Sequence, residues 1–499
     1  MSVAVPRRIL APLLAAVTWG CADPTPVERA LLPRDGASAD VGTAESQSRI
    51  VVDASEPQGD VIRFERASTH STSSPLPGEA TRDYMRRLDH DVVRTWIQVR
   101  YVYNNGNVDY NYPYESSGVG AEDALRFYAS AGKQVLVALS AYNPTSQWKL
   151  PQGEAFETFL KETLVYYKTK YPNIRFIQVG NEPDAGDETM ATYYPMYQRY
   201  YRAVNAANAA MGLGNGDRLL ITNGAFTSNT VNMLQYADGF LAAYAADPDP
   251  AKRLDVFTFH VYGETDRPAQ LGDVRQRIDA AMAKHGLPSI PTFVTEYGVF
   301  GGSTRPVRFT DAQLVTLQPA GQLTKALYLY ESGVDEVFNW AIHHGSLPMK
   351  SQLANVQTAT PYPYGNALLL ARELSARKTR ISATSSYVNS LGIGTHAVAA
   401  MKPGDGIAVL VWNYHWRTTP TQPGAFNVHI KGIPRSAVGG SRMRATVYVI
   451  DSKTNNVYTN PAQTSLVPSS TTEMAYAESV DVPLDLEPHA VALVLLTRK

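Results

Sequence analysis

The sequence predicts an α/β protein with a (β/α)8 TIM barrel followed by a C-terminal β-sandwich domain. Up to residue 377, short β-branched runs alternate with amphipathic segments, which is the pattern of βα units around a parallel sheet. After Lys378 the helical periodicity ends, and strand-like runs separated by turn residues take over. The 499 residues are enough for two domains. We therefore expect a barrel over residues 49–377 and a β-sandwich over residues 378–499.

The barrel strands are predicted from apolar runs, and the helices from apolar residues three or four positions apart. A further strand-like run, at residues 50–52, precedes the barrel and can be donated to the sandwich. The eight barrel strands are expected at 61–67, 92–99, 134–139, 175–180, 218–222, 254–259, 291–295 and 334–340. Helices are expected at 120–131, 154–169, 191–211, 274–286, 322–331 and 364–376, and sandwich strands at 407–412, 426–430, 445–450 and 490–496.

The first residues have the layout of an export signal. Arg7 and Arg8 precede a short apolar run at 9–17, and a Gly-Cys pair ends at Cys21. Residues 1–21 therefore read as a signal peptide, or as a lipoprotein signal with a lipid anchor at Cys21. Residues 22–48, rich in Pro, Ala, Gly and Ser, read as a flexible tether. Both alternatives predict a secreted, periplasmic or outer-surface protein.

Composition narrows the function classes. The formal net charge is −1, so no global field favours nucleic acid as a partner. The only cysteine excludes an intrachain disulfide and a thiolate metal cluster. No spacing of His and carboxylate residues indicates a metal site, and we expect neither a metal nor a cofactor. The sequence does not indicate an oligomeric state.

Two glutamates come at the ends of predicted barrel strands. Glu182 follows the fourth strand and Glu296 ends the seventh. The carboxyl ends of barrel strands face one shared pocket, so the two side chains can meet there. Two facing carboxyl groups are what glycoside hydrolysis requires. The alternative for each residue alone is a capping or ion-paired glutamate at a strand end.

Five short motifs resemble the barrel glycosidases of the GH-A clan, and most of all family 39, which includes β-xylosidases and α-L-iduronidase. The fourth and seventh strands end in Asn181-Glu182-Pro183 and Thr295-Glu296. Val93-Arg94-Thr95-Trp96 is similar to the motif of strand two, Phe259-His260-Val261-Tyr262-Gly263 to that of strand six, and Trp340 to the tryptophan of strand eight.

This resemblance implies a retaining O-glycoside hydrolase without a cofactor, with Glu182 as acid/base and Glu296 as nucleophile. The sequence departs from the family at two positions. Trp96 stands where a sugar-contacting histidine is frequent, and Gly180 stands where a large residue is common. Both departures concern which sugar is bound.

Seven residues are candidates for binding substrate. Arg94 can hold Glu296 ionised, or can form a structural ion pair. Asn181 has the reach to bind the hydroxyl beside the anomeric carbon. Tyr262 can donate a hydrogen bond to Glu296, and His260 can bind substrate or fill a core position. The remaining candidates are Trp96, Trp340 and one of the adjacent pair His343 and His344.

Two predicted loops on the same face are rich in aromatic and amide side chains. One runs from Tyr101 to Tyr114, and the other contains Tyr142, Asn143 and Trp148. They can form polysaccharide subsites or simply pack. The tyrosines between 193 and 201 fall at helical spacing, which favours packing.

The sequence thus predicts an enzyme that hydrolyses an oligo- or polysaccharide, with a xylosidase-like or iduronidase-like sugar as the first expectation. Three alternatives remain open: an endo-acting exopolysaccharide hydrolase, a transglycosylase with the same glutamates, and a non-catalytic carbohydrate-binding barrel.

Overall fold

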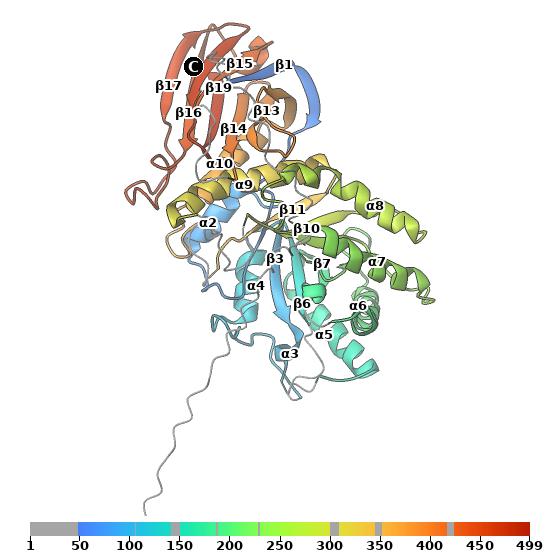
Figure 1. Ribbon diagram of the computed structural model, residues 1–499. Coiled ribbons are helices and arrows are strands. Elements are labelled where there is room, and N and C mark those ends of the chain that lie inside the picture. Colours follow the sequence, from blue (N-terminus) through green and yellow to red (C-terminus); the bar gives the residue numbers. More distant parts are fainter. Residues whose placement is uncertain are drawn as a thin grey trace, which may run out of the picture.

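A computed structural model of the chain describes residues 48–104, 106–140, 150–185, 188–227, 230–299, 309–344, 352–416 and 424–499. The predicted signal at 1–21 and all but the last residue of the predicted tether lie outside these ranges. The chain has a barrel and a smaller β domain (Figure 1). Within the described residues, no helix is both long and apolar enough to cross a membrane.

Eight parallel strands form the barrel, as predicted. They lie in the order β8-β7-β6-β3-β2-β11-β10-β9, and bridges from Thr222 to Val256 and from Phe226 to Phe259 join the two edges. Every residue of the sixth and seventh barrel strands is buried, because the strands of a parallel barrel are covered on both faces. The strands are β2 (Ala67–Thr69), β3 (Val92–Gln98), β6 (Gln134–Ser140), β7 (Ile174–Val179), β8 (Leu220–Thr222), β9 (Phe257–Val261), β10 (Thr292–Tyr297) and β11 (Glu336–Trp340).

Helices surround the barrel. The prediction missed two of them and placed the start of α9 too late: this helix begins at Asp311, where Thr310 and Gln313 form a capping box. The long helices are α2 (Glu79–Leu88) and α7 (Thr230–Ala246), both missed, and α4 (Ala121–Ala129), α5 (Glu154–Lys170), α6 (Met190–Ala210), α8 (Val274–Lys284), α9 (Asp311–Glu331) and α10 (Pro363–Ser375). Short elements are α3 (Val99–Val102), β4 (Tyr103–Asn104), β5 (Asn107–Val108), η1 (Pro183–Ala185), η2 (Pro268–Asp273) and α11 (Arg435–Val438).

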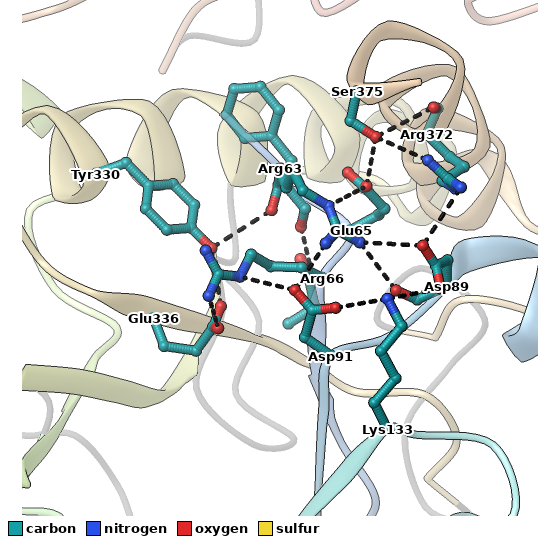
Figure 2. Close-up of polar contacts among 12 residues, drawn as sticks. Arg63, Glu65, Arg66, Asp89, Asp91, Lys133, Tyr330, Glu336, Arg372 and Ser375 are labelled. Atoms are coloured by element: carbon teal, nitrogen blue, oxygen red, sulfur yellow. Dashed lines mark hydrogen bonds and ion pairs between the residues drawn. The ribbon is translucent and has the colours of Figure 1, made fainter. Parts of the chain in front are cut away.

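The first barrel strand was predicted at residues 61–67, and this position is wrong. The strand β2 begins only at Ala67, the last residue of the predicted run. The charged residues before it lie in an ion-pair network at the amino ends of the strands (Figure 2). In that network Arg63 pairs with Asp91 at 2.7 Å, and Arg66 pairs with Glu336 at 2.7 Å. The charged side chains of this segment pair with residues at the amino ends of the strands, so the segment does not join the apolar sheet.

The C-terminal domain is a curled mixed sheet of nine strands in the order β17-β16-β19-β14-β13-β12-β1-β15-β18. Its first strand, β1 (Ser48–Asp60), runs antiparallel to β12 and parallel to β15. Ile50, Val409, Val428 and Val494 share one apolar core, so the sheet folds onto itself like a sandwich. The other strands are β12 (Thr379–Ser385), β13 (Gly394–Lys402), β14 (Gly406–Tyr414), β15 (Ala425–Lys431), β16 (Arg442–Ile450), β17 (Ser470–Ala475), β18 (Val480–Asp485) and β19 (Val491–Arg498).

The helices α9 and α10 lie between the barrel strands and the C-terminal sheet (Figure 1). Two buried aromatic residues of β14 connect the domains there. Trp412 Nε1 donates to Thr324 Oγ1 of α9 at 2.8 Å, and the hydroxyl of Tyr414 donates to the carbonyl of Thr265. Thr265 belongs to the segment that follows β9, so the second domain supports the carboxyl-end face of the barrel.

Candidate active site

Glu182 projects from a sharp turn directly after β7. Gly180 and Glu182 both have positive φ angles, 81° and 46°, which explains why a glycine precedes Asn181. The Glu182 N–H donates to the carbonyl of Gly224 at 2.8 Å. A Cβ at Gly224 would lie 2.6 Å from the Val179 carbonyl oxygen, so only glycine fits beneath the turn. Glu182 is not a glycine and yet has a positive φ angle, so its backbone stores strain of the kind found at functional sites.

Glu296 is buried near the end of β10, and each of its carboxylate oxygens accepts a hydrogen bond. Arg94 Nη1 donates to Oε1 at 2.6 Å, and the hydroxyl of Tyr262 donates to Oε2 at 2.7 Å. The Arg94 side chain is fully buried, while that of Glu296 is 7% exposed. This is a charge-assisted pair of short hydrogen bonds shielded from solvent.

Arg94 also connects Glu296 to the turn that carries Glu182. Its Nη2 donates to Asn181 Oδ1 at 2.6 Å, and its Nε donates to Gln178 Oε1 at 3.1 Å. Its guanidinium carbon lies 4.3 Å from the centre of the Trp96 ring. Gln178 was not predicted as a site residue, although it lies near the end of β7, two residues before Gly180, and its side chain faces Arg94.

His260, at the end of β9, lies between the two glutamates. Its Nδ1 is hydrogen-bonded to Glu182 Oε1 at 2.7 Å, and its Nε2 is 3.7 Å from Glu296 Oε1. One ligand atom from each of the three residues lies within 4.8 Å of the other two. Glu182 remains 28% exposed while His260 is fully buried, so the Glu182 side chain is accessible to solvent.

The surroundings of Glu296 favour its ionised form. Burial by itself raises the pKa of this carboxyl group, but the charges of His260 and Arg94, with the hydrogen bonds from Tyr262 and Arg94, outweigh it and lower the pKa. The pKa of the Tyr262 hydroxyl is raised by burial and by the neighbouring carboxylate, so the hydroxyl keeps its proton. Glu296 is therefore an anion held by neutral and cationic donors.

Glu182, His260 and Glu296 are also the donor types that a metal ion uses. Both oxygens of Glu296, however, already accept hydrogen bonds from Arg94 and Tyr262. A metal ion bound there would share the carboxylate with a buried guanidinium and would lie close to its positive charge. The arrangement therefore fits carboxylate chemistry better than metal ligation.

A cavity of about 280 Å³ opens beside these residues. Trp96 and Trp340 contribute aromatic surface to its wall, and both had been predicted to bind substrate. Asn181 also lines the cavity, and its hydrogen bond from Arg94 connects the cavity wall to the partner of Glu296. The other described lining residues are polar and were not predicted: Ser71, Thr72, Gln98, Arg100 and Ser140. Ser71 and Thr72 follow β2, so the misplaced first strand concealed them.

Some predicted contacts do not reach the cavity. His343 has no exposed surface and is absent from the cavity wall, which does not fit its predicted role in substrate binding. The chain after β11 turns its side chain into the protein, while the next ring, that of His344, contacts Trp340 at 5.6 Å. The buried Tyr112 and Tyr114 hydrogen-bond to the backbone of Gln98 and Trp96.

The two tyrosines thus anchor the segment after β3 to the end of that strand instead of forming subsites. The tyrosines of α6 are likewise buried, as their spacing predicted. Tyr142, Asn143 and Trp148 lie outside the described residues.

Comparison with known proteins gives fold relatives only. No family model matches the sequence, and no curated protein is similar to it. Solved structures are similar over most of both chains. A glucosidase from Croceicoccus marinus has a TM-score of 0.68 and 17% identity, covering 91% of this chain and 99% of its own.

A monomeric β-xylosidase from Caulobacter crescentus CB15 has a TM-score of 0.63 and 15% identity, with 90% and 99% covered. The GH39 enzyme from Xanthomonas axonopodis pv. citri has a TM-score of 0.64 and 14% identity, with 93% and 100% covered. The chain therefore has the barrel-plus-sandwich fold of these glycosidases, a GH39 enzyme among them.

Proposed function

We propose that the protein is a retaining glycoside hydrolase in which Glu296 is the nucleophile and Glu182 the acid/base. The observation that carries the proposal is the separation of the two side chains. A carboxylate oxygen of each glutamate lies within 4.8 Å of the other. Retaining enzymes hold their carboxyl groups about 5–5.5 Å apart, while inverting enzymes need about 6.5–9.5 Å to admit water.

The surroundings of the two glutamates fit these separate roles. A carboxylate of Glu296 attacks the anomeric carbon, and the bond from this carbon to the leaving-group oxygen breaks. Glu182 gives its proton to that oxygen. In the second step Glu182 takes a proton from water, the water oxygen bonds to the anomeric carbon, and the ester bond to Glu296 breaks. Arg94 and Tyr262 keep Glu296 anionic before the first step and after the second.

The cavity supports a carbohydrate as the substrate. Two tryptophans supply apolar faces for a sugar ring, while Ser71, Gln98 and Asn181 supply hydrogen-bonding groups. The β-xylosidase and the glucosidase with the same fold act on different sugars by name, and the xylosidase-like or iduronidase-like sugar remains our proposal. An endo-acting hydrolase or a transglycosylase would use the same two steps.

The remaining alternative is a carbohydrate-binding barrel without catalysis. The hydrogen bonds around Glu296 argue against it, because binding alone does not require a buried anion with its own cation. We also propose, from the sequence, that the protein is exported through residues 1–21, with or without a lipid anchor at Cys21.

A screen of chromogenic pentosides, hexosides and uronides tests the proposal. We expect turnover of at least one glycoside, its loss in Glu296→Ala, and its loss in Glu182→Ala with recovery on addition of azide, since a small anion can replace the missing base. Full turnover by Glu296→Ala would refute the assigned nucleophile.

A further inference from the structure

Lys325 is a buried lysine on α9, the helix between the barrel and the C-terminal domain. Only 1% of its surface is exposed. Its ammonium group donates to three backbone carbonyl oxygens: those of Tyr262 at 3.1 Å, Gly263 at 2.6 Å and Gly298 at 2.9 Å. An ammonium group has three N–H donors, so all of them have an acceptor.

These carbonyls belong to the segments that leave β9 and β10 at the catalytic face. Tyr262 donates to Glu296, and Gly298 follows Glu296 by two residues. Gln322 lies three residues before Lys325 on the same face of α9, and its Nε2 reaches the Tyr297 carbonyl at 3.4 Å. The same face of α9 therefore holds the segment that follows Glu296 and the segment that contains Tyr262, the hydrogen-bond donor to Glu296.

We propose that Lys325 is a positioning residue of the active site, which fixes the backbone beyond β9 and β10 so that the Tyr262 hydroxyl stays on Glu296. The inference rests on the proposed glycosidase function. It adds a residue that neither touches substrate nor lies in the cavity.

The position of Lys325 makes the restraint sensitive to pH. Burial lowers the pKa of Lys325 to about 7, against the opposing charges of Glu264 and Asp266 in the segment after β9. Below this pKa the ammonium group serves three carbonyls, whereas above it the neutral amine has only two N–H groups for them. The restraint therefore weakens as the pH rises through neutrality.

The first experiment compares wild type with Lys325→Met on an aryl glycoside that has a dinitrophenol leaving group. Such a leaving group needs no proton from Glu182, so protonation of Glu182 does not shape kcat/KM. We expect wild type to lose kcat/KM with a midpoint near pH 7. In Lys325→Met we expect kcat/KM at about pH 6 to be roughly tenfold lower, without this alkaline decline.

A matched control is Lys168→Met. Lys168 on α5 is also buried, and its Nζ donates to the carbonyls of Pro172 at 2.5 Å and Ile174 at 2.7 Å, at the amino end of β7. We expect this variant to lose thermal stability and to keep the wild-type pH profile. An alkaline decline that persists in Lys325→Met, or disappears in Lys168→Met, would overturn the proposal.

A second measurement does not depend on activity or on the folding of a variant. Hydrogen–deuterium exchange of wild type, corrected for intrinsic exchange rates, should show lower protection in peptides covering residues 262–264 and 297–299 above neutral pH than below it. Unchanged protection there would contradict the proposal. Because Glu296→Ala and Glu182→Ala test the catalytic pair alone, failure of the Lys325 proposal is distinguishable from failure of the proposed function.

Discussion

Glu296 and Glu336 are buried glutamates on the adjacent strands β10 and β11, and they lie at opposite ends of the barrel. The pKa of Glu296 is lowered, because the charges of His260 and Arg94 and two hydrogen bonds outweigh its burial. Burial raises the pKa of Glu336 to about 7, and the opposing charge of Arg66 at 2.7 Å does not compensate. Burial alone therefore does not decide whether a carboxyl group is ionised.

The surroundings of the two ends explain the difference. At the amino end, Arg66 divides its charge between Glu336 and Asp91, which also pairs with Arg63 and Lys133 (Figure 2). At the carboxyl end, Arg94 serves a single carboxylate, Glu296, and its other hydrogen bonds go to the neutral amides of Gln178 and Asn181. Among the described residues, the glutamates Glu182 and Glu296 at the carboxyl end lie beside the cavity that Trp96 and Trp340 line, whereas Glu336 at the amino end does not. The same kinds of residue thus hold the barrel together at one end and prepare an anion at the other.

The largest expected effect on activity comes from removing Arg94, the cation that pairs with Glu296. Loss of one partner of a buried ion pair costs about 3–5 kcal/mol. If Arg94→Met loses this much from the transition state, kcat/KM falls by roughly 150- to 5,000-fold. The acid limb of its pH profile should move to higher pH, since the pKa of Glu296 rises. Steady-state kinetics against pH measures both.

The control at the opposite end is Arg66→Met, which removes a pair of similar length. We expect lower stability and kcat/KM close to wild type. Equal losses of activity in the two variants would remove the distinction between the ends.

The next effect concerns the tyrosine that donates to each glutamate. A hydrogen bond to a charged group contributes about 1.5–3 kcal/mol, so Tyr262→Phe should lower kcat/KM roughly 10- to 100-fold. Tyr330 donates to Glu336 Oε1 at 3.2 Å, and Tyr330→Phe should leave kcat/KM unchanged. A Tyr262→Phe enzyme as active as wild type would show that this hydroxyl has no role in catalysis.

The third effect is on stability against pH. The pKa of Glu336 is raised from 4.5 to about 7, so the unfolded chain releases its proton at lower pH than the folded chain. Its contribution to stability is complete below about pH 4.5 and is lost as the pH rises to about 7, by at most about 3 kcal/mol. Glu336→Gln should remove this loss.

Denaturant unfolding of wild type and Glu336→Gln at several pH values between about 4.5 and 8 measures the difference. The difference is the relevant quantity, because buried histidines act in the opposite direction: the pKa of His90 is lowered to about 4, which favours the folded state as the pH rises. A difference that does not change across this window would refute the raised pKa of Glu336.

The smallest expected effect comes from adding one methyl group at each end of the barrel. Gly224→Ala forces the Glu182 turn away from Val179, at a cost of about 1–3 kcal/mol, and should lower kcat several-fold. A Cβ at Gly214, before β8, has no heavy atom within 4 Å. Gly214→Ala should leave kcat unchanged, and a comparison of kcat and melting temperature in the two variants checks this.

The barrel and its eight parallel strands were predictable because strands covered on both faces contain continuous apolar runs, as in β6. β2 was not, since it has three residues and follows a charged segment that pairs with residues far along the chain. The helix α2 was missed because half of its ten residues are charged and only four are buried.

The candidate site was partly predictable for the same physical reason. Glu182, Glu296 and Tyr262 stand at or near the carboxyl ends of strands, where the barrel geometry brings them together, and Arg94 reaches Glu296 from within β3. Contacts that depend on the path of a loop were not predictable. His343 is buried and does not line the cavity, and Lys325 acts from a helix at the outer surface of the barrel.

The most direct test of the central claim is to trap the covalent intermediate. A fluorinated analogue of the active glycoside, with fluorine on the carbon beside the anomeric centre, slows both steps, and a good leaving group keeps the first step faster than the second, so that the intermediate accumulates. After peptic digestion, mass spectrometry should find one fluorosugar on the peptide that contains Glu296. A sugar attached to Glu182, or turnover with inverted anomeric configuration and no adduct, would contradict the account.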